Sequence, residues 1–309
     1  MKKRRIVSIV IALLIVIFML TSCTPGNGPT PPPKKALSAF NTSCLPLAVT
    51  ETDGGYGSFT LDANGNLLFV VNDSDEIRLL DRNTCTVTTV ATGVSGGSVL
   101  LGMTYNNGSI YVGADNGNIY KVDPTSGSST LFATISSPVN GIVIAPAAYG
   151  SYGGQLIVAT EDGDIYAVDQ SVASPTPVLI ANIGGSYASA LIFGIDGTLY
   201  VAAYDETVSA NNKIVTVTAV GVVTDFATGF SNPDGLAIDN NGGFLYVADS
   251  GDDTLKSVTI PGGIVSTITS VDFDDGWYPS PIIYDATSNI LLMGSGEDSL
   301  TIVYYNLPT

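Results

Sequence analysis

A short apolar pattern recurs six times along the chain, and this repeat limits the fold more than any other feature. Each copy is a run rich in Val, Ile, Leu and Tyr. Gly, Asn or Asp follows it, and further apolar runs stand on either side. The copies are separated by 42, 46, 43, 46 and 46 residues, measured between Val70, Val112, Val158, Val201, Val247 and Met293. Four short strands per repeat at this spacing, divided by turn residues, are typical of a β-propeller.

The sixth repeat is one strand short, and a matching strand stands at the other end of the domain. Repeats one to five each have a fourth apolar run, whereas the sixth stops after its third. The segment 45–51 precedes repeat one and resembles the other fourth strands. We therefore predict an all-β fold for residues 36–309, a six-bladed β-propeller with four-stranded blades. Its last blade is closed by the N-terminal strand, which removes the open edge that invites aggregation.

The first 35 residues predict export and lipid attachment. Residues 1–22 have a basic head (2–5), a 15-residue apolar stretch (6–20) and small residues before Cys23, as in a lipoprotein signal peptide. The Leu-Thr-Ser-Cys that ends at Cys23 resembles the bacterial lipobox, which implies cleavage before Cys23 and diacylglycerol on its sulfur. An uncleaved anchor helix is the alternative, but a membrane span needs about 20 apolar residues. Residues 23–35, rich in Pro and Gly, predict an extended tether.

The chain is strongly acidic and contains no histidine. It has 28 acidic and 11 basic residues, and four of the basic ones lie in the signal peptide. The mature chain would carry 7 − 28 = −21 charges, which argues against nucleic-acid binding because phosphate contacts need basic side chains. Without histidine, Ser-His-Asp triads, Cys-His pairs and histidine-bound zinc are excluded.

Acidic residues stand in every turn between second and third strands, and in a propeller these turns share one face. The candidate binding face combines three of these residues with four aromatic residues from connections between blades: Asp205, Asp249, Asp252, Tyr56, Tyr187, Trp277 and Tyr278. Such a face suits a cation such as Ca²⁺, or a protein or carbohydrate partner. The alternative is structural, because Asp bonds readily to the backbone of its own turn and aromatic rings fill the space between blades.

One segment carries a family resemblance. Asn-Pro-Asp-Gly-Leu-Ala-Ile-Asp (232–239), followed by Leu-Tyr-Val-Ala-Asp-Ser-Gly (245–251), resembles an NHL repeat. The rhythm of all six repeats is similar to NHL and gluconolactonase-like propellers, six-bladed and TolB-like. The lactonases among them hold a divalent metal in the central channel through a Glu, two Asn and an Asp, each at the start of an innermost strand.

Only part of that ligand set is present in this sequence. Asp234 matches the family Asp and Asn140 matches one Asn, but Gly57 stands at the Glu position and Ser189 at the second Asn. Asn140, Ser189 and Asp234 are therefore candidate channel or metal residues of a degenerate site. No catalytic residue is assigned.

Cys44 and Cys85 are predicted to stay unpaired. Both stand just before a fourth strand, on adjacent blades of the closed ring. Because neighbouring strands of a blade lie ~4.8 Å apart, a fourth strand lies about 20 Å from the axis of the ring. Equivalent positions on adjacent blades of a six-bladed ring would then be roughly 20 Å apart. A disulfide allows only about 4.4–6.8 Å between Cα atoms.

Taken together, these features predict a lipid-anchored, extracytoplasmic binding or scaffolding module of the bacterial cell envelope. The membrane would be the cell membrane or the outer membrane, and the partner a protein or a carbohydrate. The alternative is a metal-dependent lactonase or esterase of the gluconolactonase-like type, with a substitute for the Glu that is missing at Gly57.

Overall fold

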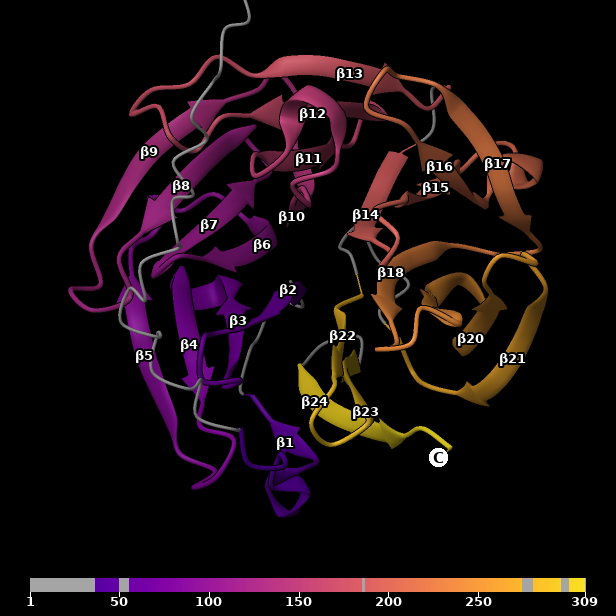
Figure 1. The fold of residues 1–309 in the computed structure, drawn as a ribbon. Coiled ribbons are helices and arrows are strands. Elements are labelled where there is room, and N and C mark those ends of the chain that lie inside the picture. Colours follow the sequence, from indigo (N-terminus) through magenta and orange to yellow (C-terminus); the bar gives the residue numbers. More distant parts are fainter. Residues whose placement is uncertain (1–36, 50–55, 185–186, 274–279, 296–299, 309) are drawn as a thin grey trace, which may run out of the picture. The chain divides into compact units, whose positions relative to one another are not determined.

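The computed structural model describes residues 37–308 except 50–55, 185–186, 274–279 and 296–299, and it confirms the six-bladed propeller. The described strands form six four-stranded antiparallel sheets, the blades, which follow one another around a ring (Figure 1). The predicted signal peptide, Cys23 and the tether lie outside the described residues.

Blades one to five each contain four consecutive strands, the first beside the central channel and the fourth at the rim. Blade one comprises β2 (Tyr56–Leu61), β3 (Leu67–Val71), β4 (Glu76–Leu80) and β5 (Val87–Thr92). Blade two comprises β6 (Leu100–Asn106), β7 (Ser109–Ala114), β8 (Asn118–Val122) and β9 (Ser129–Thr134). Blade three comprises β10 (Val139–Ile144), β11 (Leu156–Thr160), β12 (Asp164–Val168) and β13 (Val178–Asn182).

Blades four and five repeat this order. Blade four comprises β14 (Tyr187–Phe193), β15 (Leu199–Tyr204), β16 (Lys213–Val217) and β17 (Val223–Thr228). Blade five comprises β18 (Pro233–Ile238), β19 (Phe244–Asp249), β20 (Thr254–Thr259) and β21 (Val265–Ser270).

Blade six is built from both ends of the described chain. Its first three strands are β22 (Ile282–Asp285), β23 (Ile290–Ser295) and β24 (Thr301–Asn306), and its fourth is β1 (Leu47–Ala48). Leu47 pairs with Ile302 and Ala48 with Thr301. The predicted closure by an N-terminal strand is therefore confirmed, with a strand of only two residues.

The hydrophobic core is divided into six clusters, one between each pair of adjacent blades. The second strands of the blades supply most of it, because a strand covered on both faces reads as a continuous apolar run. The six residues that mark the sequence repeat all lie on second strands and are buried. The repeat therefore measures the distance from one buried second strand to the next.

The antiparallel order gives the ring two different faces. We call the end that carries the loops from second to third strands, and the connections between blades, the upper face. The end that carries the turns from first to second and from third to fourth strands is the lower face.

Helical structure is confined to five 3₁₀ turns in the described ranges: η1 (Thr42–Cys44), η2 (Asn72–Ser74), η3 (Gly150–Tyr152), η4 (Ser209–Asn211) and η5 (Ser250–Asp252). No helix in this part of the chain has the length and apolar character needed to cross a membrane.

Polar bonds on the lower side fasten the seam between blades six and one. Arg82, after β4, donates to Asp285 at the end of β22 (3.0 Å), and both side chains are buried. Arg82 also donates to the Gly65 carbonyl (3.0 Å). Asn41 N–H donates to the Arg82 carbonyl (2.7 Å), so the segment before β1 is held against blade one. Phe40 packs in the core cluster of this seam, and its N–H donates to Ser288 Oγ in blade six (2.6 Å).

The prediction that Cys44 and Cys85 are unpaired is wrong. The two form a disulfide with a Cα–Cα distance of 5.2 Å. The 20 Å estimate assumed that both residues occupy equivalent places on adjacent blades. Cys85 lies in the β4–β5 turn, but Cys44 ends η1 in a segment that starts against blade one, where Ser38 bonds to Asn83. The path of this segment, and not the position of a fourth strand, therefore brings the two sulfurs together.

Candidate functional site

A cavity of about 160 Å³ lies in the central channel and is lined by the first strands of all six blades. Four polar residues on its wall come from consecutive blades, three to six: Asn140, Ser189, Asp234 and Ser280. The structure therefore brings together the three candidate channel residues that the sequence comparison selected, and adds Ser280. Their role stays a prediction.

A local irregularity aims each candidate residue at the channel. The pairing register shifts between Val139 and Gly141 in β10, between Ala188 and Ala190 in β14, and between Pro233 and Gly235 in β18. The extra residues at these shifts are Asn140, Ser189 and Asp234. A β-bulge leaves one residue unpaired and redirects its side chain, a device that is common beside functional sites.

Close packing explains the small residues after the bulges. A Cβ atom added to Gly235 would lie 2.1 Å from the Ser280 carbonyl, and one added to Gly102 would lie 2.6 Å from Cα of Gly141. Glycine is therefore required where innermost strands approach each other. The dipeptides Asn-Gly at 140 and Asp-Gly at 234 combine a channel side chain with this close approach.

The channel residues differ in how their polar atoms are bonded. Asp234 is buried and accepts a hydrogen bond from the hydroxyl of Ser250, which is itself buried at the start of η5. Ser189 is 5% exposed, and its Oγ has no hydrogen-bond partner among the described residues. An unbonded buried hydroxyl costs about 1–3 kcal/mol, so this atom calls for an explanation.

Two tyrosines and two glutamates lie on the upper side of the same bulges. Tyr187 and Tyr204 pair across β14 and β15, with ring centroids 5.9 Å apart. Burial, followed by the charges of Glu206 and Glu161, raises the pKa of Tyr187. Burial, followed by the charges of Glu206 and Asp234, raises the pKa of Tyr204. Both rings therefore remain protonated hydrogen-bond donors beside a group of carboxylates.

Glu161 is the carboxyl of this group whose environment disfavours its charge. Partial burial is the first cause that raises its pKa, and the negative charges of Asp162 and Glu206 add to it. A positive charge placed among these carboxylates would relieve the repulsion. The upper end of the channel is thus electrostatically suited to a cation.

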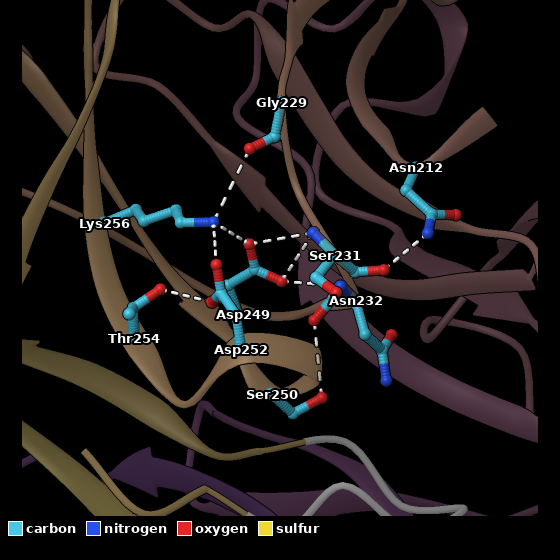
Figure 2. Close-up of polar contacts among 9 residues, drawn as sticks. All are labelled: Asn212, Gly229, Ser231, Asn232, Asp249, Ser250, Asp252, Thr254 and Lys256. Atoms are coloured by element: carbon cyan, nitrogen blue, oxygen red, sulfur yellow. Dashed lines mark hydrogen bonds and ion pairs between the residues drawn. The ribbon is translucent and has the colours of Figure 1, made fainter. Parts of the chain in front are cut away.

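Other acidic residues of the upper face have structural roles. Asp249 is fully buried, accepts from Ser231 N–H (3.0 Å) and Asn232 N–H (2.5 Å), and forms an ion pair with Lys256 (Figure 2). Lys256 also contacts Asp252 at 2.8 Å. Asp249 thus ties the connection between blades four and five to β19, inside the loop and away from the surface.

Asp205 is bonded in the same manner within its own loop. Its carboxylate accepts from Asn211 Nδ2 (2.7 Å) and from Thr207 Oγ1 (2.7 Å) and N–H (2.9 Å). These bonds, led by the one from Asn211, lower the pKa of Asp205 to about 2. The turn interpretation of the acidic loops accounts for Asp205 and Asp249, whereas Glu161 and Glu206 face the channel tyrosines.

Three members of the candidate binding face cannot be placed by their side chains. Trp277 and Tyr278 lie outside the described residues, and Tyr56 is described only by its backbone at the start of β2. The same holds for Gly57, which stands at the position of the family Glu. The described residues contain no cluster of three His, Cys, Asp or Glu side chains with metal-site geometry. The channel offers oxygen ligands from Asn140, Ser189 and Asp234, the donor type that hard cations such as Ca²⁺ prefer.

Sequence reasoning did not select Tyr204 or Ser250 as site residues. Tyr204 ends β15 opposite Tyr187, so the strand register would have identified it. Ser250 follows Asp249 in the loop and turns its hydroxyl to Asp234, 16 residues away. A contact of this kind depends on the fold of η5 and leaves no signal in the spacing.

Solved structures of similar fold include enzymes and a binding protein. A virginiamycin B lyase from Staphylococcus aureus is 16% identical over 85% of this chain and 88% of its own, with a TM-score of 0.58. A gluconolactonase from Xanthomonas campestris is 14% identical over 82% and 87%, with a TM-score of 0.63. An auxiliary nutrient binding protein from Bacteroides thetaiotaomicron is 16% identical over 87% and 75%, also with a TM-score of 0.63. Identities this low establish the fold alone.

At the level of sequence, a comparison with the curated proteins found no significant match. A family model described as a repeat of unknown function, DUF6923, matches residues 41–198. This match extends from η1 through the first three blades to the turn after β14. It covers just over half of the 309 residues, and the chain therefore belongs to the DUF6923 repeat family, here in the form of a six-bladed β-propeller.

Proposed function

We propose that this propeller is a ligand-binding module of the cell envelope, held at a membrane by lipid on Cys23, and that its ligand binds at the upper end of the central channel. The observation that carries the proposal is the Ser189 hydroxyl, which is buried on the channel wall and has no hydrogen-bond partner in the ranges that the structure describes. A ligand oxygen, nitrogen or cation would supply the missing bond. The similarity in fold to a nutrient binding protein supports a binding role.

The ligand we propose is small and carries positive charge. Carboxylates from three blades, Glu161, Glu206 and Asp234, act on the same pair of tyrosines. Described basic side chains near this mouth are already engaged, as Lys256 is with Asp249 and Asp252. A calcium ion would be held by Asn140, Ser189 and Asp234, with water in the remaining coordination positions.

Calorimetric titration with Ca²⁺, and separately with a small organic ammonium ion, tests the proposal. Asp234→Asn should weaken binding at least tenfold, because hydrogen bonds and contacts to charged groups are worth about 1.5–3 kcal/mol. Ser189→Ala should weaken it by a smaller factor. Leu131→Ala, on the exposed side of β9, is the control and should leave affinity unchanged. Binding that survives both channel substitutions would place the ligand elsewhere.

The membrane location has its own test. The mature protein should begin at an acylated Cys23 by mass spectrometry, and Cys23→Ser should leave the membrane fraction or accumulate as precursor. A wild-type N-terminus at any other residue would reject the lipid anchor without affecting the channel proposal.

A second candidate function is a metal-dependent lactonase, favoured by the presence of both Asn140 and Asp234 on the channel wall and by the similarity in fold to a gluconolactonase. The virginiamycin B lyase is a poorer guide, because a variant of it with one histidine replaced by alanine is catalytically inactive, and this chain has no histidine. Lactone hydrolysis in the presence of Ca²⁺, Zn²⁺ or Mn²⁺, lost in Asp234→Asn, would establish the enzyme over the binding module.

A further inference from the structure

The turns of the lower face divide into two kinds. In each of blades one to three, the turn between third and fourth strands begins with an aspartate. These residues are Asp81, Asp123 and Asp169. Hydrogen bonds from each turn lower the pKa of its aspartate. Backbone N–H groups are the main cause for Asp81 and Asp123, and the Ser171 hydroxyl is the main cause for Asp169. Blades four and five have no acidic residue in the corresponding turns, whose sequences are Thr-Ala-Val-Gly-Val (218–222) and Ile-Pro-Gly-Gly-Ile (260–264).

Large apolar side chains project from the lower face of blades four and five. Val220 is 86% exposed, Ile195 69% and Ile264 64%, and Val222 and Phe244 are also exposed. We call these five residues the apolar tips. Four of them lie on three turns of the two blades, and Phe244 begins β19. Exposed apolar groups of this size on one side of a protein mark an interaction surface.

Direct contacts connect some of the turns that carry the apolar tips. A Cβ atom on Gly242 would lie 2.6 Å from Ile195, which places the first turns of blades four and five in contact. Phe244 pairs with Thr259, and Thr259 N–H donates to the Ile264 carbonyl (3.0 Å). Val222 N–H donates to Thr218 Oγ1 in the β16–β17 turn. β16 pairs with β15, the strand that follows the Ile195 turn.

Asp196 and Asp239 lie in the first lower turns of blades four and five, and both accept hydrogen bonds from their own turns. Asp196 accepts from Thr198 N–H and Oγ1, each at 3.0 Å. Asp239 accepts from Gly243 N–H at 2.8 Å. The oxygens of both carboxylates are therefore engaged within the same turns.

The chain enters the propeller on this same lower face. Leu37 lies beside Gly65 in the β2–β3 turn, and Ser38 bonds to Asn83 in the β4–β5 turn. Thirty-six residues precede Leu37, and they include the apolar stretch and Cys23. A lipid on Cys23 would keep Leu37, and with it the lower face, within about 50 Å of the bilayer, because the 14 residues from Cys23 to Leu37 span at most ~3.6 Å each.

We propose that the apolar tips dock on the surface of a lipid bilayer. The orientation agrees with the proposed lipid anchor, and the docking itself would occur without it. Single apolar side chains on separate, protruding turns suit insertion between lipid headgroups, where no complementary pocket is required. The acidic turns of blades one to three disfavour anionic lipid, so zwitterionic lipid is the better surface.

Flotation of residues 37–309, which contain all described strands, the seam and the disulfide, tests docking without the anchor. Phosphatidylcholine vesicles should carry the protein upward, and adding phosphatidylglycerol should reduce this. Val220→Asp with Ile264→Asp should lower partitioning at least tenfold. Leu131→Asp with Leu179→Asp is the matched control, because these leucines are 60% and 53% exposed on rim strands β9 and β13 and should have no effect.

Three results would overturn the proposal. The first is that the wild-type protein does not float with the vesicles, and the second is an equal loss of flotation in both double variants. The third is a concentration-dependent dimer that dissociates in Val220→Asp with Ile264→Asp, which would assign the tips to a second copy of the chain. Thermal melting of both double variants should match the wild type. Calcium titration of the tip variant should be unchanged, which separates failure of the docking proposal from failure of the channel proposal.

Discussion

The seam between blades six and one and the channel mouth between blades three and five both bury polar side chains, but they use them differently. At the seam, Arg82 and Asp285 form a buried ion pair, and the guanidinium also donates a hydrogen bond to the Gly65 carbonyl. Its Nε has no partner within the described ranges, yet both terminal nitrogens are bonded. At the mouth, the Ser189 hydroxyl makes no bond in the described part of the chain. The Arg82 and Asp285 side chains that fasten the ring thus each have bonded partners, whereas the Ser189 hydroxyl on the cavity wall has none among the described residues.

Breaking the seam should have the largest effect on stability. Asp285→Ala leaves the Arg82 charge buried without its partner, a change that typically costs about 3–5 kcal/mol. Equilibrium urea unfolding should show this loss. Arg82→Met with Asp285→Leu removes both charges and should recover most of it. A loss below about 1 kcal/mol for Asp285→Ala would mean that the seam depends on apolar packing alone.

The disulfide should contribute nearly as much. It closes a loop of 41 residues between Cys44 and Cys85, for which loop-entropy arguments give about 4 kcal/mol. Cys44→Ser with Cys85→Ser should lower the free energy of unfolding by roughly that amount. The reduced wild type should show the same loss. A reduced protein as stable as the oxidised one would mean that β1 holds the ring without covalent help.

Two equally buried serines test the same comparison, with an expected change of about 1 kcal/mol in the free energy of unfolding. Ser189→Ala removes the unbonded hydroxyl and should raise the stability of the ligand-free protein by about 1 kcal/mol. Ser137→Ala is the control, because Ser137 is equally buried at 5% exposure but accepts from Asp162 N–H (3.2 Å). It should lower stability by a similar amount. The same sign in both variants would show that Ser189 already has a partner.

The smallest effect concerns titration on the upper face. Asp205 should titrate near 2 and Glu161 above its ordinary value, because one carboxylate is bonded and the other is partly buried among like charges. The lowered pKa of Asp205 means that its contribution is complete above about pH 4 and is lost as pH falls toward 2. The raised pKa of Glu161 acts in the opposite direction, so its ionisation costs stability as pH rises above about 4.5. Carbon-detected NMR titration measures both, and equal values would remove the distinction between the two loops.

The sequence predicts the propeller well because its signal is local and repeated. Each buried second strand, such as the run around Val247, is apolar on both faces and recurs at a fixed distance. The positions of Asn140, Ser189 and Asp234 on the channel wall also follow from aligning strand starts. Long-range paths leave no such pattern. The segment from Leu37 to Cys44 crosses between two blades, and the Cys44–Cys85 link depends on that path.

The bonding state of a side chain is equally hidden from sequence. Asp205, Asp249 and Glu161 stand at comparable places on the upper face, yet Asp205 and Asp249 accept hydrogen bonds from neighbouring donors, whereas Glu161 is partly buried among like charges. The difference arises from the loop conformations, for example η4, whose Asn211 reaches Asp205. Turn composition indicates that some acidic residues are structural but does not identify which.

The two-residue strand β1 also has a consequence for the order of assembly. Its partner Ile302 lies 255 residues beyond Leu47, so on a chain that is synthesised from its N-terminus the closing strand waits for the last blade. Cys44 and Cys85 can join when little more than the first blade exists, because only 41 residues separate them. Closing that shorter loop costs about 1.6 kcal/mol less in chain entropy than pairing β1 with β24 directly. The disulfide thereby holds β1 close to blade one. The ring is then completed when β24 of blade six pairs with β1, which is already in place.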